Sequence, residues 1–250
     1  MNLELEGQVA VIAGGAGAIG YASALRLARR GARVVLLGRA SDDAHAKAAA
    51  LPGAGHCAIE ADLVSGAALV RAAEQVRERH GRADILVNSG GFTRPVPHAS
   101  LDALDDELID AIFAANWRAP FAAIRAFAPL LRESGRGVVV NVSSIAATTG
   151  IGSNVAYCAA KAGLDAMATS LGRALAPHIR VLNVSPGVVD SAFVPGRDAS
   201  FNDKQAATTP LKRIGQPDDI AAAIEACATT LLFATGTVIQ VDGGRHLGAA

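Results

Sequence analysis

The chain has 250 residues, a length that fits one large α/β domain or two small ones. Apolar residues make up 51% and charged residues only 18%, which suits a wide buried core and further contacts between subunits. Lys and Arg together number 23, as do Asp and Glu, so this balance gives no indication of a nucleic-acid partner.

The N-terminus and the cysteines limit the location of the protein. The chain starts with Met-Asn-Leu-Glu-Leu-Glu, which is acidic where a secretory signal is basic, and no apolar run reaches membrane-spanning length. Cys57, Cys158 and Cys227 are odd in number, far apart and without the spacing of metal ligands. We therefore expect a soluble, cytoplasmic protein with reduced thiols, no metal and no membrane partner.

The first predicted elements form a βαβ unit. A short apolar run from Val9 to Ala13 ends in glycines, and a helical pattern follows from about Ile19 to Arg30. A second apolar run extends from Arg33 to Leu37. A strand, a glycine turn, a helix and a strand in this order are typical of a βαβ unit.

The rest of the chain continues this alternation. Further apolar runs, mostly separated by helical patterns, lie at His56 to Glu60, Ile85 to Asn88, Val138 to Val142, Ile179 to Val184 and Val238 to Val241. Continuous apolar runs are typical of strands that are buried on both faces. The pattern predicts an α/β fold, a Rossmann-like doubly wound parallel sheet of seven strands flanked by helices. Without a linker or repeat, we predict one domain over 1–250, with a substrate-loop excursion near 191–211.

A glycine-rich turn joins the first strand to the first helix. Glycines let the backbone approach a pyrophosphate closely, and the helix N-terminus behind them offers unpaired N–H groups. Such turns also serve tight packing, but a position after the first strand of a βαβ unit favours nucleotide binding. The candidate contacts are Gly14, Gly15, Gly17, Ala18, Ile19 and Gly20.

The end of the second strand bears on the choice of nucleotide. An acidic residue there would bind the adenosine ribose of NAD, but the chain has Gly38 and Arg39. A guanidinium group binds a 2′-phosphate through paired, charge-assisted hydrogen bonds. We therefore predict NADP(H) in preference to NAD(H). In the alternative, Arg39 only solvates a loop, and Asp42 or Asp43 reaches the ribose.

Polar residues also follow the third and fourth strands. Asp62, with Leu63 beside it, follows the third strand, and Asn88, Ser89 and Gly90 follow the fourth. In a doubly wound sheet these strand ends open on one crevice. Asp62 would accept a hydrogen bond from the adenine amino group, and the other turn would lie against the nucleotide. Ordinary turn chemistry is the alternative for each.

A long helical pattern from about Leu104 to Leu131 contains Pro120. Proline has no N–H, so the carbonyl group of Asn116 loses its helical partner. A carbonyl group freed inside a protein needs another donor, such as an ordered water. The sequence leaves two interpretations open: a tolerated kink, or a bound water on a proton path.

Ser144, Tyr157 and Lys161 stand in otherwise small and apolar sequence. Tyr157 and Lys161 are four apart where a helix begins, so their side chains share one helical face. A phenol has an ordinary pKa of ~10 and ionises more readily beside a cation. Ser144 follows a strand and would bind a substrate oxygen. Considered alone, Tyr157 and Lys161 would be a pair on a helix surface, and Ser144 would cap a turn. Together with the nucleotide-binding turn, they indicate a site for proton transfer.

These motifs, in this order, resemble the short-chain dehydrogenase/reductase family over nearly the whole chain. The family's glycine turn matches Ala13 through Gly20, with Ala13 and Ala18 as departures, and its Asn-Asn-Ala-Gly turn matches Asn88 through Gly91. The resemblance implies that the catalytic residues are Asn116, Ser144, Tyr157 and Lys161, and the usual separation from the tyrosine selects Ser144 over Ser143. It also implies that Tyr157, Lys161, Pro186, Gly187, Val189 and Ser191 contact the cofactor.

The activity that the resemblance implies is reduction of a ketone by NADPH, or the reverse oxidation of an alcohol. Ser144 would bind the carbonyl oxygen, Tyr157 would act as general acid or base, and Lys161 would lower the phenol pKa and hold the nicotinamide ribose. A water bound to the Asn116 carbonyl group would return a proton to the site through Lys161. A small free ketone is the favoured substrate, with cavity walls from residues 91–98, 145–154 and 191–204.

Two other functions remain open. In 3-oxoacyl-acyl-carrier-protein reductases, basic residues usually stand where this chain has Gly135 and His178, but Arg132, Arg136 and Arg180 lie nearby. A non-catalytic NADP(H)-sensing protein would be expected to have lost its Ser, Tyr and Lys set, which is intact here. The resemblance also implies a homotetramer, or a homodimer.

Overall fold

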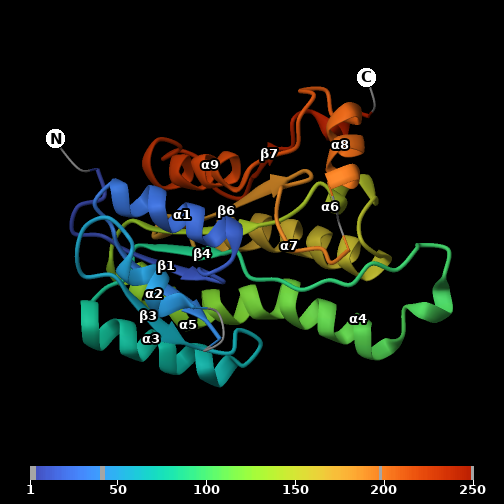
Figure 1. The fold of residues 1–250 in the computed structure, drawn as a ribbon. Coiled ribbons are helices and arrows are strands. Elements are labelled where there is room, and N and C mark those ends of the chain that lie inside the picture. The colour runs from blue at the N-terminus through green and yellow to red at the C-terminus, as the bar shows by residue number, and fades with distance from the viewer. Residues whose placement is uncertain (1–3, 40–42, 197–198, 249–250) are drawn as a thin grey trace.

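The computed structural model describes residues 4–39, 43–196 and 199–248 (Figure 1). Seven parallel strands form one sheet in the order β3-β2-β1-β4-β5-β6-β7. The strands are β1 (Val9–Ala13), β2 (Arg33–Gly38), β3 (Cys57–Glu60), β4 (Ile85–Asn88), β5 (Gly137–Val142), β6 (Ile179–Pro186) and β7 (Val238–Val241). The chain winds outward from β1 to β3 and then crosses to β4. The predicted doubly wound, seven-stranded sheet is confirmed.

Helices cover both faces of the sheet. On one face lie α1 (Ala18–Arg29), α2 (Ala44–Ala49) and α9 (Pro217–Thr229). On the other lie α3 (Gly66–His80), α5 (Ala119–Glu133) and α7 (Val155–Ala174). Three shorter helices, α4 (Asp106–Phe113), α6 (Ala146–Thr149) and α8 (Ala199–Thr208), lie at one end of the molecule, on the right of Figure 1.

The first strand shows why its sequence is apolar at every position. Val9 and Val11 face the helix layer of α3 and α5, whereas Ala10 and Ile12 face the layer of α1 and α9. All four side chains have no exposed surface. Because successive residues of a strand point to opposite faces, a sheet covered on both faces buries every residue of its central strands.

The region predicted as one long helix is divided. A π-helical turn at Ala114–Arg118 separates α4 from α5, and within it the Ala119 N–H donates to the Ala114 carbonyl oxygen. Pro120 follows this turn as the second residue of α5. The wider turn changes the hydrogen-bond register just before the proline, so the chain keeps a helical path without the missing N–H. Farther on, the excursion expected near 191–211 contains a ten-residue helix, α8.

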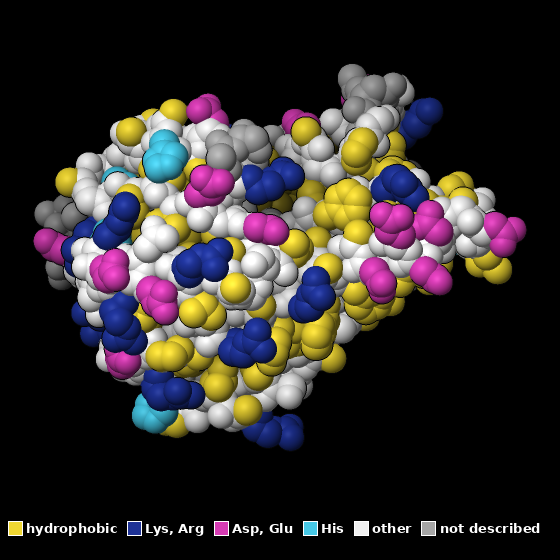
Figure 2. Space-filling model, turned by 90° about the horizontal axis from the view of Figure 1, so that it is seen from below, with side chains coloured by type: hydrophobic (Ala, Val, Ile, Leu, Met, Phe, Trp, Pro, Cys, Tyr) yellow, Lys and Arg dark blue, Asp and Glu magenta, His cyan; other side chains and the backbone are white. Residues whose placement is uncertain are grey.

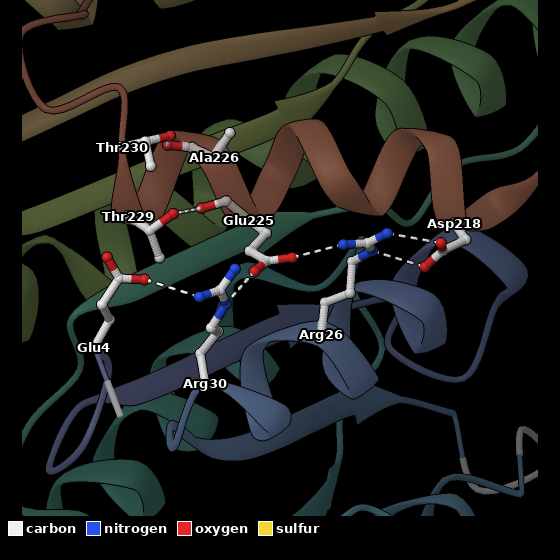
Figure 3. A network of polar contacts seen from close by, with 8 residues as sticks. All are labelled: Glu4, Arg26, Arg30, Asp218, Glu225, Ala226, Thr229 and Thr230. Atoms are coloured by element: carbon white, nitrogen blue, oxygen red, sulfur yellow. Dashed lines mark hydrogen bonds and ion pairs between the residues drawn. The ribbon is translucent and has the colours of Figure 1, made fainter. Parts of the chain in front are cut away.

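An ion-pair network joins α1 to α9 (Figure 3). Arg26 pairs with Asp218 and, through Nη1 at 2.8 Å, with Glu225. Arg30 pairs with Glu225 and, at 3.2 Å, with Glu4. The Glu225 side chain is only 8% exposed, so both guanidinium groups neutralise a largely buried carboxylate. The network fastens α9, which leads to the edge strand β7.

The surface below the sheet carries mixed charge. Figure 2 shows basic side chains interspersed with acidic ones on this face, and acidic side chains gathered toward the end where α4 lies. Asp106 and Glu107 belong to the first turn of that helix. Within residues 4–39, 43–196 and 199–248, no helix has the length and apolarity to span a bilayer.

Candidate active site

Two cavities adjoin beyond the carboxyl ends of the central strands. The first has a volume of about 650 Å³, and the second about 810 Å³. Ser89, Gly90, Gly91 and Phe193 line both. Ser89, Gly90 and Gly91 follow β4, which pairs with β1 where the strand order reverses, so the cavities lie at the topological switch point of the sheet.

The first cavity contains Ser144, Tyr157 and Lys161. The side chain of Asn154 caps α7 by accepting a 2.7 Å hydrogen bond from the Tyr157 N–H. Tyr157 thus lies in the first turn of α7 and Lys161 one turn later. The Lys161 Nζ lies 5.7 Å from the centre of the Tyr157 ring, so the two predicted neighbours are close in space.

Lys161 is a buried cation. The residue is only 4% exposed, and its Nζ donates a 2.8 Å hydrogen bond to the Val142 carbonyl oxygen. Burial lowers the pKa of Lys161 to about 8, while the carboxylate of Asp165 opposes the shift. The ammonium group is therefore close to its titration range near neutral pH, which suits a group that assists proton transfer.

Ser144 follows β5 and faces the first cavity. Its Oγ accepts a 3.2 Å hydrogen bond from the Ala146 N–H, which leaves the hydroxyl proton able to donate. Ser143 lines the same cavity, but it is only 3% exposed and its Oγ has no partner among the described residues. The geometry alone therefore brings both serines to the cavity.

Unlike the other three residues, Asn116 does not reach the cavity surface. It is fully buried in the π-helical turn and lines neither cavity. Its Nδ2 donates to the Phe92 and Ile112 carbonyl oxygens at 2.7 and 2.9 Å, while its Oδ1 is buried without a partner among the described residues. A Cβ on Gly91 would lie 2.7 Å from that Oδ1, so Asn116 stands directly behind the cavity wall.

The glycine turn lies at the edge of the second cavity, which Gly14 and Gly17 line. Gly14 has a φ of +77°, and a Cβ there would lie 2.5 Å from the Gly90 N. Gly15 and Gly20 line neither cavity. A Cβ on Gly20 would lie 2.3 Å from the Gly14 carbonyl oxygen, and one on Gly15 would lie 2.7 Å from the Leu36 side chain. In the structure, these two glycines serve protein packing.

The other predicted cofactor contacts divide between the cavities. Arg39, Asp62, Leu63 and Asn88 line the second cavity. Ile19, Pro186, Gly187, Val189 and Ser191 line the first, whereas Ala18, the first residue of α1, lines neither. Asp62 Oδ1 also accepts a 3.1 Å hydrogen bond from the Val64 N–H, so it takes part in ordinary turn chemistry as well.

Asn88 has an unusual environment at the end of β4. It is 3% exposed, and its Nδ2 donates a 2.8 Å hydrogen bond to Asn141 on the neighbouring strand. Its Oδ1 is buried and has no partner among the described residues. Since buried acceptors normally have a donor, this oxygen points to a group that binds at the second cavity.

Several residues that line the cavities were not predicted from the sequence. Lys47 lines the second cavity and its Nζ donates a 2.8 Å hydrogen bond to Ala16 in the glycine turn. Gln205 and Arg245 line the first cavity. Lys47 belongs to no motif, but Arg245 directly follows Asp242-Gly243-Gly244, which is a turn signal in the sequence. Of the two residues in the alternative cofactor assignment, Asp43 lines the second cavity and Asp42 is outside the described residues.

Comparison with known proteins establishes the family. A family model described as enoyl-(acyl carrier protein) reductase matches residues 14–246. A crystal structure from Brucella melitensis, titled as a short-chain dehydrogenase/reductase of the glucose/ribitol dehydrogenase group, superposes with a TM-score of 0.90 at 32% identity and covers 98% of both chains. The chain belongs to the short-chain dehydrogenase/reductase family.

Curated relatives of this short-chain dehydrogenase/reductase include both reductases and dehydrogenases. A protein of Streptomyces violaceoruber, assigned as ketoacyl reductase 2 of the granaticin polyketide synthase, is 37% identical over 249 residues, which are 97% of each chain. A D-threitol dehydrogenase of Mycolicibacterium smegmatis is 33% identical over 248 residues, covering 97% of this chain and 94% of that one. The chain is therefore an oxidoreductase of a family that uses nicotinamide cofactors.

The second cavity fits a dinucleotide. At Gly14 the turn lies so close to Gly90 that there is no room for a Cβ. The buried Asn88 Oδ1 lacks a donor among the described residues. Arg39 and Lys47 contribute positive charge to the cavity lining. Phosphates and a hydrogen-bonding base match this combination of close backbone, acceptor and cations.

Proposed function

We propose that this enzyme interconverts a ketone and a secondary alcohol with NADP(H), and that Tyr157 is its general acid and base. The observation that supports this most directly is the position of the Lys161 Nζ, 5.7 Å from the centre of the Tyr157 ring, in a cavity that Ser144 also lines. Bound NADPH would supply the hydride. A phenol, a cation and a hydroxyl around one cavity can manage the accompanying proton.

Each residue has a distinct part in reduction. Ser144 donates a hydrogen bond to the carbonyl oxygen and stabilises the charge that develops there. Tyr157 gives its proton to that oxygen. Lys161 stabilises the phenolate that remains, because a nearby cation favours the charged form of an acid. Asn116 holds a water at its main-chain carbonyl, and through Lys161 this water returns a proton to Tyr157.

The cofactor would lie across both cavities. Gly14 and Gly17, with Ala18 at the start of α1, receive the pyrophosphate, while Asp62 and Leu63 contact the adenine. Asn88, Ser89 and Gly90 lie against the middle of the cofactor. Tyr157 and Lys161 hold the nicotinamide ribose, and the nicotinamide contacts Ile19, Pro186, Gly187, Val189 and Ser191.

The preference for NADP(H) rests on Arg39 and Lys47, both of which line the second cavity. Two cations favour a 2′-phosphate, whereas Asp43 in the same cavity would favour an unmodified ribose. Michaelis constants for NADPH and NADH, measured with the same ketone, test this assignment. We expect a clear preference for NADPH; a preference for NADH would show that Arg39 does not select the cofactor.

A 3-oxoacyl thioester is the second candidate substrate, because the Streptomyces relative is assigned as a ketoacyl reductase. Docking of an acyl carrier protein would need basic residues at the surface. Arg180 is already engaged, since its guanidinium donates to the carbonyl oxygens of Leu231, Ala234 and Cys227. This favours a small free ketone. Turnover of a 3-oxoacyl thioester and of simple ketones, with both cofactors, distinguishes the two candidates.

We further propose a single-domain chain that forms a homotetramer or homodimer in the cytoplasm. Leu232 and Phe233 are 63% and 107% exposed, as expected of residues that a second subunit covers. Light scattering after size-exclusion chromatography gives the number of subunits.

A non-catalytic cofactor sensor is the remaining alternative. If the protein binds NADPH but turns over no compound of a broad carbonyl panel, it is such a sensor.

A further inference from the structure

Arg245 occupies a fixed place beside the first cavity. It opens a short 3-10 helix, Arg245–Leu247, directly after the turn that ends β7. Gly243 and Gly244 have φ values of +65° and +83°, which glycine adopts without strain. The turn is held by Asp242, whose carboxylate accepts hydrogen bonds from the main-chain N–H groups of Gly244 and His246 at 3.0 and 2.7 Å.

The guanidinium group of Arg245 has only neutral partners. Its Nη1 donates to the Gln205 carbonyl oxygen and the Thr208 hydroxyl, each at 3.2 Å, and to the Thr209 hydroxyl at 3.4 Å. Its Nη2 donates to the Gln205 side-chain oxygen. No ion pair joins Arg245 to a carboxylate in the described part of the chain, and Asp242 is engaged with main-chain N–H groups and His246. Within the described part of the chain, the positive charge is thus hydrogen-bonded but not neutralised.

The surroundings strengthen the field of this charge. Among the described residues that line the first cavity, Arg245 and Lys161 are cationic and none is acidic. Phe193, Val194 and Phe201 contribute apolar walls. An unneutralised cation in a partly dry cavity attracts an anion more strongly than the same cation in water does.

We propose that Arg245 binds an oxyanion carried by the substrate, a carboxylate or a phosphate ester, so that the substrate is an acidic ketone or its alcohol. This proposal rests on the reductase function proposed above. Both N–H groups of Nη1 and one of Nη2 are engaged with Gln205, Thr208 and Thr209, and the Nε–H and the second Nη2–H have no partner among the described residues. Two N–H donors of one guanidinium group match the paired oxygens of either oxyanion. The substrate would place its carbonyl group at Tyr157 and Ser144 and its oxyanion at Arg245, both in the first cavity.

A purely structural role makes a different prediction. Arg245 contacts Gln205 and Thr208 on α8, so it could serve only to hold that helix over the cavity. Loss of such a clamp would change the turnover of charged and uncharged ketones alike. Loss of an oxyanion site would change the turnover of the charged member of a matched pair only.

The test compares matched substrates in the whole enzyme with NADPH. The pairs are 4-oxopentanoate with its methyl ester, which probes a carboxylate, and dihydroxyacetone phosphate with dihydroxyacetone, which probes a phosphate. We expect Arg245→Gln to lower kcat/KM for the charged member by about ten- to a hundredfold and to leave the neutral member within about threefold. Arg245→Lys should retain part of the discrimination. Arg29→Gln, on the exposed side of α1, is the control.

Equilibrium binding of the same compounds to the NADP⁺-loaded enzyme, which has no hydride to transfer to a ketone, gives by calorimetry a result that does not depend on turnover. The proposal predicts tighter binding of one charged compound than of its neutral partner, and loss of that difference in Arg245→Gln. Equal binding of both members of each pair, or no binding of either anion, overturns it. Preferential anion binding without reduction of any ketone would instead contradict the proposed reductase function and leave the oxyanion site standing.

Discussion

The Lys161 Nζ donates a 2.8 Å hydrogen bond to the main-chain carbonyl oxygen of Val142, the last residue of β5. This bond joins the N-terminal part of α7 to the strand that Ser144 follows. It directs the ammonium group inward, where it lies 5.7 Å from the centre of the Tyr157 ring. The relative positions of the three polar groups therefore depend on a contact between the carboxyl end of a central strand and a helix.

Replacement of Tyr157 by Phe removes only a hydroxyl group from the first cavity. We expect kcat to fall by about 10²- to 10⁴-fold because the general acid is lost, while NADPH binds nearly as before. Steady-state kinetics and NADPH fluorescence titration measure the two effects. Tyr21→Phe, on α1, changes the only other tyrosine and should leave kcat unchanged. Substantial activity in Tyr157→Phe would remove the general-acid assignment.

Lys161 makes stability depend on pH in a predictable direction. Its pKa is about 8 in the folded protein against 10.5 for the ordinary group, so the unfolded chain binds more protons between these values. Wild-type stability should therefore rise relative to Lys161→Met as pH increases from about 8 to 10.5, by up to ~3 kcal/mol. Urea unfolding of both proteins across this range measures the difference; parallel pH profiles would show that Lys161 is not desolvated.

Lys47→Met tests the second cation of the second cavity. The Nζ of Lys47 is anchored to the Ala16 carbonyl oxygen at 2.8 Å, beside the glycine turn. If it faces a 2′-phosphate, its loss should weaken NADPH binding about tenfold and leave NADH binding unchanged. Fluorescence titration with both cofactors gives the ratio. Lys204→Met, on the exposed side of α8, is the control; equal losses for both cofactors would assign Lys47 to turn stability alone.

Gly20→Ala should destabilise the fold by at least about 2 kcal/mol. Its Cβ would lie 2.3 Å from the Gly14 carbonyl oxygen and 2.7 Å from the Ser89 Oγ, so α1 would have to move away from the sheet. Gly66→Ala, at the start of α3, meets only the Arg125 side chain at 3.4 Å and should be neutral or slightly stabilising. Thermal and urea unfolding compare the variants, and equal stabilities would contradict this reading of the packing.

Glu225→Gln tests the network of Figure 3. The change leaves Arg26 and Arg30 beside a neutral, largely buried group, and we expect a loss of about 1–3 kcal/mol of stability. Glu133→Gln breaks an exposed pair with Arg77, in which the side chains are 55% and 48% exposed, and should cost less than about 0.5 kcal/mol. Urea unfolding at neutral pH compares the two variants. Similar losses of stability would show that the burial of Glu225 does not strengthen its ion pairs.

The sequence by itself predicted the seven parallel strands, the glycine turn and the meeting of Tyr157 with Lys161. These features depend on local rules. Strands buried on both faces need continuous apolar runs, a turn beside a phosphate needs glycines, and residues four apart in a helix share a face. Neighbours in the chain are then neighbours in space, so pattern and spacing are sufficient to predict them.

Only the tertiary structure decided which side chains from distant segments meet. Lys47 reaches the glycine turn because α2 packs beside β2, and Arg245 reaches the first cavity because β7 ends next to β6. The role of Gly20 in packing and the burial of Asn116 behind Gly91 likewise depend on contacts across crossover connections. Such contacts follow from the path of the whole chain and from the close packing of its layers, and no local pattern specifies either.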